Sequence, residues 1–250
     1  MAAETNLEKY NDPEVVAYYV DKTGLQPCEE LLFERWLNPG LRILDIGFGG
    51  GRTTPFLSKR GRHYVGVDYS QAMVDACSKR FPGLEFRHGD ATDLSQFADG
   101  EFDAVVFSFN GIDCIRTDEA RARCLKEVAR VLNVGGVFIF SSHNPQALGV
   151  LPLLAGARGM QIPWRILYSL FASLRLTWRS VRGDAFWRGG GYLLDSVHGG
   201  LVMYAATPEK LSPQIQSAGL EVLEIVGGRY PDTKLRYFTP WYYYACRKSG

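Results

Sequence analysis

The sequence predicts an α/β fold, in which a mostly parallel sheet of seven strands carries helices on both faces. Between residues 41 and 142, strand-like apolar runs alternate with helical patterns, an order typical of parallel strands joined by right-handed crossovers. The runs FDAVVFSF and GGVFIFSS are apolar at consecutive positions, as in strands that helices cover on both faces. At 250 residues, the chain suits one such domain.

The N-terminal residues 1–40 are expected to form a helical cover. Apolar residues recur at roughly helical spacing from Asp12 to Leu37, Pro13 lies just inside the expected cap, and the sequence NPG at 38–40 ends the pattern. Strand-like runs follow at 41–47, 62–67, 84–88, 102–109 and 136–142, with helical patterns between them at 51–60, 70–80 and 117–132.

After the fifth strand the alternation breaks. Residues 145–200 are rich in Pro, Gly, Trp and Arg, and we expect them to form an inserted cap. The segment GLVMYAAT then predicts a strand, and PEKLSPQIQSAG predicts a helix with Thr207 as its cap. LEVLEIVG and WYYYACRK complete the sheet, whose last strand is expected to be antiparallel.

Composition excludes several classes of function. A net charge of +1 gives no general attraction to nucleic acid. The five cysteines are widely spaced without a CxxC pair, which favours reduced thiols over disulfides or zinc. The sequence shows neither the apolar core of a signal peptide nor a run of about 18 apolar residues. We therefore expect a cytoplasmic protein, as a monomer or a homodimer.

The segment ILDIGFGGGRTT at 43–54 predicts a ligand-binding turn after the first strand. A dinucleotide fingerprint needs a third glycine where this chain has Arg52. The carboxylate of Asp45 suits an ammonium group better than a pyrophosphate. Asp68 ends the second strand, where it could accept hydrogen bonds from ribose hydroxyls, and Asp90 follows the third strand, where it could accept from an adenine amine.

With these residues in place, the chain resembles the class I S-adenosylmethionine-dependent methyltransferases, close to the small-molecule branch called type 11 or type 25. Five blocks carry the resemblance in the family's order: ILDIGFGGG, VGVDYS, HGDATDL, FDAVVFSFNGID and LKEVARVLNVGGVFIFSS. It covers residues 40–144 strongly and 201–247 moderately. The resemblance implies a Rossmann-like fold, a single methyltransferase domain over residues 1–250, and S-adenosylmethionine as cofactor with S-adenosylhomocysteine as product.

The resemblance also implies roles for individual residues. Asp45, Gly47 and Gly49 would border the methionine portion of the cofactor, Asp68 would hold the ribose, and Tyr69 would lie against the adenine. An aromatic residue near the N-terminus often closes over the cofactor in this family, for which Tyr10, Tyr18 and Tyr19 are candidates. The implied cofactor-binding set is Tyr19, Asp45, Gly47, Phe48, Gly49, Asp68, Tyr69, Met73, Asp90, Ala91, Thr92, Ser108, Phe109 and Asn110.

Two residues are candidates for a general base. His143 follows the fifth strand at the edge where such sheets bind ligands, and a histidine suits proton transfer near neutral pH; the alternative is a histidine that bonds a loop carbonyl or lines the substrate pocket. Asp113 is the second candidate, and a turn or helix cap is its alternative. His198 could enter from the insertion or be an exposed turn residue. The four histidines show no metal-binding spacing, so no metal is expected.

The insertion at 145–200 is expected to set acceptor identity. It holds six arginines against two acids, Asp184 and Asp195, and three tryptophans. This basic amphipathic pattern allows peripheral membrane contact or an anionic acceptor, although a cap with its arginines in water is the simpler interpretation. The glycines at 188–192 suggest a hinge, so the insertion could act as a lid.

The function predicted from these observations is methyl transfer to a small-molecule acceptor, with oxygen favoured over nitrogen. One alternative is a sugar, glycolipid or other lipid-like anionic acceptor. An alternative of another class is a non-catalytic cofactor-binding partner protein. A nicotinamide oxidoreductase is disfavoured by Arg52 in the glycine motif.

Overall fold

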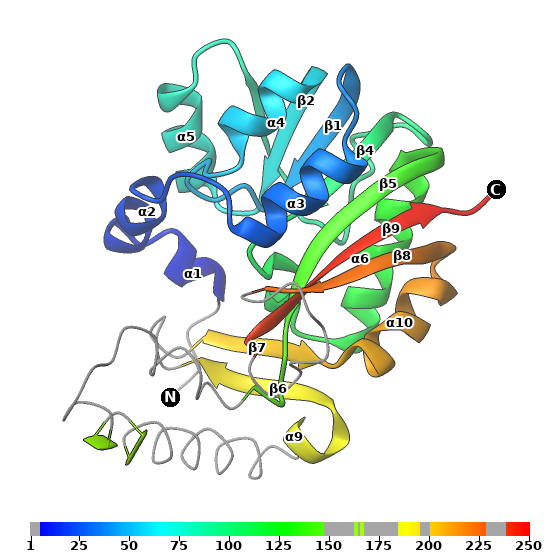
Figure 1. The fold of residues 1–250 in the computed structure, drawn as a ribbon. Coiled ribbons are helices and arrows are strands. Elements are labelled where there is room, and N and C mark those ends of the chain that lie inside the picture. Colours follow the sequence, from blue (N-terminus) through cyan, green and yellow to red (C-terminus); the bar gives the residue numbers. More distant parts are fainter. Residues whose placement is uncertain (1–5, 148–162, 165, 168–184, 196–200, 229–238) are drawn as a thin grey trace.

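A computed structural model describes residues 6–147, 163–164, 166–167, 185–195, 201–228 and 239–250 of the chain. Its strands form one sheet, confirming the predicted α/β class and the antiparallel last strand (Figure 1). The strands are β1 (Leu41–Ile46), β2 (Gly61–Asp68), β3 (Glu85–His88), β4 (Phe102–Phe107), β5 (Leu132–His143), β6 (Gly190–Asp195), β7 (Leu201–Ala206), β8 (Leu220–Gly227) and β9 (Trp241–Lys248).

The sheet runs β3-β2-β1-β4-β5 with all neighbours parallel, and it branches at β5. From Val137 to His143, β5 pairs with β9. That strand is antiparallel to β5 and pairs in turn with β8. At its last residue, His143, β5 also pairs with Ala205 of β7. The carboxyl end of β5 therefore lies where two parts of the sheet diverge.

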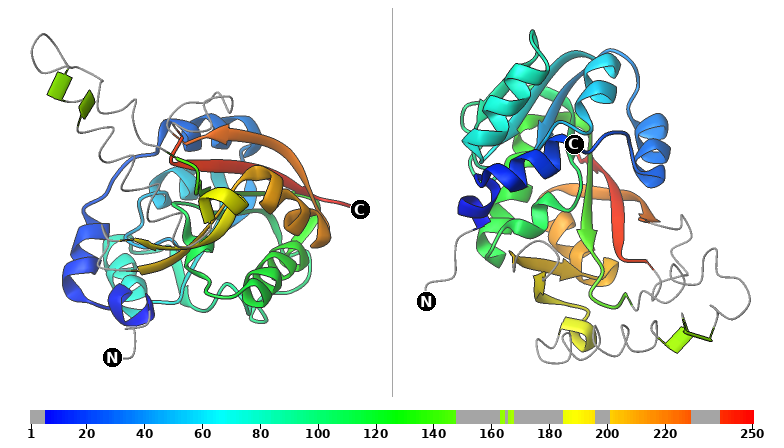
Figure 2. Two further views of the ribbon diagram at one scale, coloured as in Figure 1. Left: turned by 90° about the horizontal axis from the view of Figure 1, so that it is seen from below. Right: turned by 90° about the vertical axis from the view of Figure 1, so that its left-hand side faces the viewer.

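The described part of the sheet has nine strands, so the prediction of seven is wrong. β7 matches the predicted strand GLVMYAAT, whereas β6 was not predicted; the two form a hairpin paired from Gly190↔Ala206 to Asp195↔Leu201. The glycines at 188–192 had suggested a hinge, but Gly190 and Gly191 begin β6 instead. Antiparallel pairing with β7 holds this backbone extended. Figures 1 and 2 show the hairpin at the end of the sheet where β5 finishes.

The N-terminal cover is interrupted, whereas the sequence pattern predicted one helix from 12 to 37. Gly24 has a φ of +78°, which interrupts the helical backbone, and a separate helix begins at Pro27. A capping box between Gln26 and Glu29 starts the second long helix. The helices are α1 (Asn6–Tyr10), α2 (Pro13–Val20), α3 (Pro27–Trp36), α4 (Thr54–Arg60), α5 (Gln71–Arg80), the 3₁₀ turn η1 (Gly111–Cys114), α6 (Asp118–Val131), α9 (Ala185–Arg188) and α10 (Pro208–Ser217).

Two hydrophobic layers hold the central strands, as the consecutive apolar runs predicted. Phe138 and Phe140 of β5 face the layer formed with α6 and α10, and Ile139 faces the layer formed with α3 and α4. The rings of Phe138 and Phe140 stack with centroids 4.7 Å apart, and Tyr244 of β9 continues the stack at 4.9 Å. The carboxyl ends of β1, β2 and β4 are thereby held on a rigid scaffold.

Among the described helices, none is long and apolar enough to span a bilayer. Most of the insertion at 145–200, including His198, lies outside the described residues, and so do five of its six arginines. Of its described residues, Trp164, Ile166 and Leu167 are helical and exposed, by 74%, 41% and 58% respectively.

Candidate functional site

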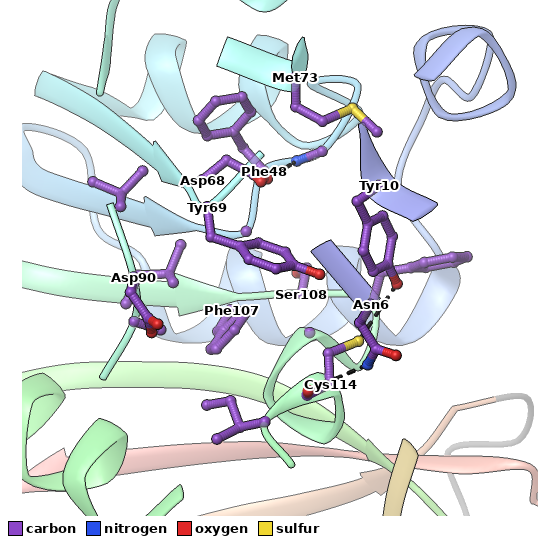
Figure 3. Close-up of a pocket in the computed structure, with 18 of the residues that line it drawn as sticks. Asn6, Tyr10, Phe48, Asp68, Tyr69, Met73, Asp90, Phe107, Ser108 and Cys114 are labelled. Atoms are coloured by element: carbon purple, nitrogen blue, oxygen red, sulfur yellow. Dashed lines mark hydrogen bonds between the residues drawn. The ribbon is translucent and has the colours of Figure 1, made fainter. Parts of the chain in front are cut away.

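A cavity of about 480 Å³ lies where β1, β2 and β4 reach their carboxyl ends, with α1 and α2 forming part of its wall (Figure 3). This is the edge at which open α/β sheets bind ligands. The residues of the predicted cofactor-binding set that line it are Tyr19, Gly47, Phe48, Gly49, Asp68, Tyr69, Met73, Asp90, Ala91, Thr92, Ser108 and Phe109. The other two members of the set, Asp45 and Asn110, are buried and do not belong to this lining.

The glycine-rich loop after β1 lacks side chains at Gly49 and Gly50 for two different reasons. Gly49 has a φ of +56°, and an added Cβ would meet only the Tyr19 ring at 3.8 Å, so its main chain faces the cavity. At Gly50, an added Cβ would lie 2.2 Å from the backbone carbonyl of Tyr19. The end of α2 therefore packs directly on the loop. Arg80 fixes this contact, because its guanidinium donates to the carbonyls of Val20 and Gly50 at 2.6 and 2.7 Å.

The Asp68 carboxylate lies in the cavity wall and is held by two backbone N–H donors. Its Oδ2 accepts from the backbone N–H of Gly49 and its Oδ1 from that of Ser70, both at 2.9 Å. Each oxygen has further lone pairs, and the residue lines the cavity. Burial raises the pKa of Asp68 to about 6, although the two N–H donors act in the opposite direction. Such a carboxylate can accept hydrogen bonds from neighbouring hydroxyls.

Asp45 lies beneath the glycine-rich loop. Its Oδ2 accepts from the hydroxyls of Thr53 at 2.9 Å and Tyr64 at 3.0 Å. Burial raises its pKa to about 7. Its Oδ1 is buried and has no hydrogen-bond partner among the described residues. A buried acceptor is rarely left unpaired, so this atom suits a donor that is not part of the described chain.

Tyr69 and Asp90 form another part of the wall, after β2 and β3. The Tyr69 ring extends into the cavity (Figure 3), and its buried hydroxyl finds no partner in the described part of the chain. Asp90 is exposed, and its Oδ1 accepts from the backbone N–H of Thr92 at 2.8 Å. One acceptor oxygen of Asp90 and one hydroxyl of Tyr69 are thus available to a ligand.

The N-terminal cover closes the cavity with more residues than sequence patterns identified. Of the three candidate tyrosines, Tyr10 and Tyr19 line it, whereas Tyr18 is 48% exposed and does not. The Tyr10 hydroxyl lies 3.4 Å from Cys114 Sγ. Asn6 is buried, and its amide donates to the carbonyls of Cys114 at 3.4 Å and Val202 at 3.2 Å. α1 therefore joins η1 to the β6–β7 hairpin, a contact between segments far apart in sequence that no motif announces.

The loop after β4 is conformationally strained. Phe109 and Asn110 have φ values of +56° and +61°, which cost non-glycine residues about 1–3 kcal/mol each. A hydrogen bond from the Asn110 backbone N–H to Ser141 Oγ, at 2.7 Å, holds this geometry. The buried Ser108 Oγ and Asn110 Oδ1 have no partner among the described residues. Strain of this kind clusters at functional sites.

The two candidate bases prove to be hydrogen-bonded to each other. His143 Nδ1 donates to Asp113 Oδ2 at 2.7 Å, and the His143 backbone N–H donates to the same oxygen at 2.7 Å. Ser142 Oγ donates to Asp113 Oδ1 at 2.7 Å. Burial raises the pKa of Asp113, against the opposing effect of these donors. Asp113 and His143 are called the dyad below. The Nε2 atom of His143 lies 3.2 Å from Asn110 Nδ2, so the dyad contacts the strained loop.

Neither Asp113 nor His143 lines the cavity. The turn η1, which carries Asp113, contributes Gly111 and Cys114 to the lining. The His143 side chain is 29% exposed, whereas that of Asp113 is fully buried. Among the described residues, no group of three or more His, Cys, Asp or Glu side chains could hold a metal ion.

The central part of the chain is similar in sequence to known methyltransferases. Residues 44–140 match the family model described as a methyltransferase domain. The chain is 40% identical over 108 residues to a demethylmenaquinone methyltransferase from Clavibacter sepedonicus, a match covering 42% of each chain. It is 37% identical over 111 residues to a fatty-acid O-methyltransferase from Mycolicibacterium smegmatis, covering 43% of this chain and 39% of the relative. The chain thus matches less than half the length of these curated relatives.

Solved structures extend the similarity to nearly the whole fold. The 1,6-didemethyltoxoflavin-N1-methyltransferase from Burkholderia thailandensis, solved with 1,6-didemethyltoxoflavin and S-adenosylhomocysteine bound, superposes with a TM-score of 0.61. The superposition covers 95% of this chain and 86% of that one at 14% identity. At this level of identity the likeness concerns the fold.

Proposed function

We propose that this chain, whose residues 44–140 match the methyltransferase domain family and whose fold is similar to that of the class I enzymes, transfers a methyl group from S-adenosylmethionine to a small-molecule acceptor. The observation that carries the proposal is the Asp68 carboxylate, held by two backbone N–H groups in a cavity at the carboxyl ends of β1, β2 and β4. A ribose diol is the ligand group that such a carboxylate suits.

The unpartnered polar atoms around the cavity support this cofactor. Asp68 would accept from the ribose, Tyr69 and Asp90 would border the adenine, and Ser108 would border the methionine portion. The buried Asp45 Oδ1 lies beneath the loop at that portion and could accept from a donor there. When bound, the cofactor supplies a methyl group activated by its attachment to a positively charged sulfur. The chain's contribution is then to orient the reactants and to remove a proton where the acceptor requires it.

The dyad favours oxygen as the acceptor atom. A neutral amine attacks through its own lone pair, whereas a hydroxyl is a weak nucleophile until a base takes its proton. His143 has its Nδ1–H committed to Asp113, which leaves Nε2 as the atom that can accept a proton. Asn110 donates to Nε2 in the present geometry, and an acceptor hydroxyl would take over that hydrogen bond.

The organisation around the site is part of the same proposal. Residues 1–250 form a single methyltransferase domain, in which residues 1–40 cover the cofactor and 145–200 cap the acceptor. The contributions of α1 and α2 to the cavity wall support the first assignment. The exposed Trp164 and Leu167, in a segment with a local charge of +4, support a lipid-like or anionic acceptor as the second candidate.

Calorimetric titration with S-adenosylmethionine, and separately with NADH, tests the proposal. Wild-type protein is expected to bind S-adenosylmethionine at micromolar concentrations and NADH much more weakly. Asp68→Ala should abolish the binding, and Asp75→Ala, at an exposed acid of α5 outside the cavity, is the matched control. Absence of S-adenosylmethionine binding by folded wild-type protein would refute the proposal. Transfer of labelled methyl to hydroxylated, amine and fatty-acid acceptors separates an enzyme from a non-catalytic binding partner.

A further inference from the structure

Lys22 is a basic residue of the cavity wall that sequence patterns did not single out. It follows α2, is half-buried, and lines the cavity beside the glycine-rich loop. Its Nζ lies 4.3 Å from the ring centroid of Tyr18, 5.8 Å from that of Tyr19 and 4.8 Å from that of Phe109. Aromatic faces attract an ammonium group, and their bulk removes part of its hydration. The three rings therefore hold the charge at the edge of the cavity.

The other cation of the cavity lining near this loop is Arg52, and its charge is neutralised within the protein. Its guanidinium forms a two-pronged ion pair with Glu29, with N–O distances of 2.5 Å, and donates to the Gly24 carbonyl at 2.9 Å. Within the described part of the chain, no carboxylate forms an ion pair with Lys22. Lys22 thus contributes a net positive charge to the glycine-rich side of the cavity.

Arg116 and Arg123 also line the cavity and have no ion-pair partner among the described residues. Both are exposed, and they come from the turn before α6 and from α6 itself. The ring of Phe109, by contrast, lies close to both Lys22 and Arg52 in the loop after β4. Arg80 donates to the Gly50 carbonyl from outside the cavity lining, so among the lining cations the charge beside the glycine-rich loop that no acid neutralises is that of Lys22.

We propose that Lys22 binds the carboxylate of the amino-acid portion of the cofactor. The inference rests on the proposed function, because a ligand without that carboxylate would have no use for the charge. The methionine portion carries one anionic group, and the acids around the cavity, Asp68 and Asp90, cannot pair with it. A partly desolvated ammonium forms strong charge-assisted hydrogen bonds with a carboxylate. Lys22 is thus a cofactor-positioning residue, which fixes the end of the ligand remote from the adenine.

Calorimetry with two ligands, S-adenosylmethionine and decarboxylated S-adenosylmethionine, isolates this contact. Lys22→Met should weaken binding of S-adenosylmethionine about 10- to 100-fold, the range for a hydrogen bond between charged groups. The same variant should bind the decarboxylated ligand within about twofold of wild type. Lys22→Arg is expected to retain most of the affinity, and Lys126→Met, at an exposed residue of α6 outside the cavity, should match wild type.

The outcomes separate this inference from the proposed function. If wild-type protein binds S-adenosylmethionine and Lys22→Met binds it equally well, Lys22 does not hold the carboxylate, while the proposed function stands. Equal losses for both ligands would show that Lys22 acts through packing, which also overturns the inference. Failure of wild-type protein to bind either ligand would overturn the proposed function first. Circular dichroism verifies folding, and Lys22→Gln replaces Lys22→Met if the latter does not fold.

Discussion

Glu29→Ala is expected to be among the most destabilising single substitutions in the N-terminal half. Glu29 lies in the first turn of α3 with its side chain fully buried. Its carboxylate accepts both prongs of the Arg52 guanidinium, the Tyr243 hydroxyl at 2.6 Å and the Gln26 backbone N–H at 2.7 Å. The substitution therefore leaves a cation that is only 10% exposed without its partner, and a tyrosine and a helix cap without their acceptor.

The structure sets the size of the effect. Removing one partner of a buried ion pair costs about 3–5 kcal/mol, because the remaining charge stays desolvated. Glu34, on the same helix, pairs with Arg60, and the side chains are 55% and 22% exposed. A pair of this kind contributes about 0–1 kcal/mol. Glu34→Ala is therefore a matched control that removes the same chemical group from the same element.

Urea unfolding followed by circular dichroism measures both variants. With a slope of about 3 kcal/mol per molar urea, a loss of 3–5 kcal/mol lowers the unfolding midpoint by about 1–1.7 M. Glu34→Ala should change it by no more than about 0.3 M. If the free energies of unfolding of the two variants differ by less than about 1 kcal/mol at equal slope, the inference that Glu29 neutralises a buried charge is incorrect.

Three further predictions concern the cavity and the dyad. Because burial raises the pKa of Asp68 to about 6, the folded state binds the extra proton, and this group should lower the free energy of unfolding by up to about 3 kcal/mol as pH rises from 4 to 7; Asp68→Asn should lack that part of the slope in urea unfolding measured across pH. Asp113→Asn should slow methyl transfer about 10²- to 10⁴-fold, because His143 loses the acceptor that fixes its tautomer, while calorimetry should find cofactor affinity unchanged. Gly50→Ala should displace the end of α2 and cost about 1–3 kcal/mol in thermal unfolding, more than Gly190→Ala, where φ is likewise outside the left-handed region and an added Cβ would meet nothing closer than 3.5 Å. The first expectation is contradicted if wild type and Asp68→Asn show the same dependence of unfolding free energy on pH. The second is contradicted if Asp113→Asn loses cofactor affinity as much as rate, and the third if the two glycine substitutions cost the same free energy of unfolding.

The glycine-rich side of the cavity could be predicted from the sequence because its geometry is local. Each parallel strand ends at the same edge of the sheet, so an acid that ends a strand must lie at that edge. Asp68 follows this rule. Its two hydrogen bonds come from Ser70, in the same motif, and from Gly49, in the glycine-rich motif that ends the neighbouring strand. The order of the motifs along the chain was therefore enough to place these residues together.

The remaining features depend on contacts that local patterns do not encode. His143 and Asp113 were each identified, but their pairing required the compact turn η1 and the strained backbone at Asn110. β6 escaped prediction because its glycines suggest a hinge, and only pairing with β7 makes them extended. Asn6 became part of the cover through hydrogen bonds to carbonyls 108 and 196 residues away. In each case the deciding interaction joins segments without a shared motif.

Arg52 illustrates how a residue's role changes once its partner is known. In the sequence it only argued against a dinucleotide, whereas in the structure it is a cavity-lining cation whose charge Glu29 neutralises. Its guanidinium carbon lies 5.0 Å from the Phe109 ring centroid, and Lys22 Nζ lies 4.8 Å from the same centroid. Releasing Arg52 from Glu29 would therefore provide a second cation close to the position of Lys22.

This arrangement predicts that Glu29→Ala partly rescues Lys22→Met. The double variant should bind S-adenosylmethionine about 3- to 10-fold more tightly than Lys22→Met alone, because a freed Arg52 can pair with the same carboxylate. It should gain nothing for the decarboxylated ligand, since that ligand has no group for the guanidinium to bind. Titrations at a temperature where both proteins are folded by circular dichroism provide the measurement. A double variant that binds S-adenosylmethionine no better than Lys22→Met would mean that the anion lies beyond the reach of Arg52, and that Lys22 and Arg52 serve separate parts of the cavity.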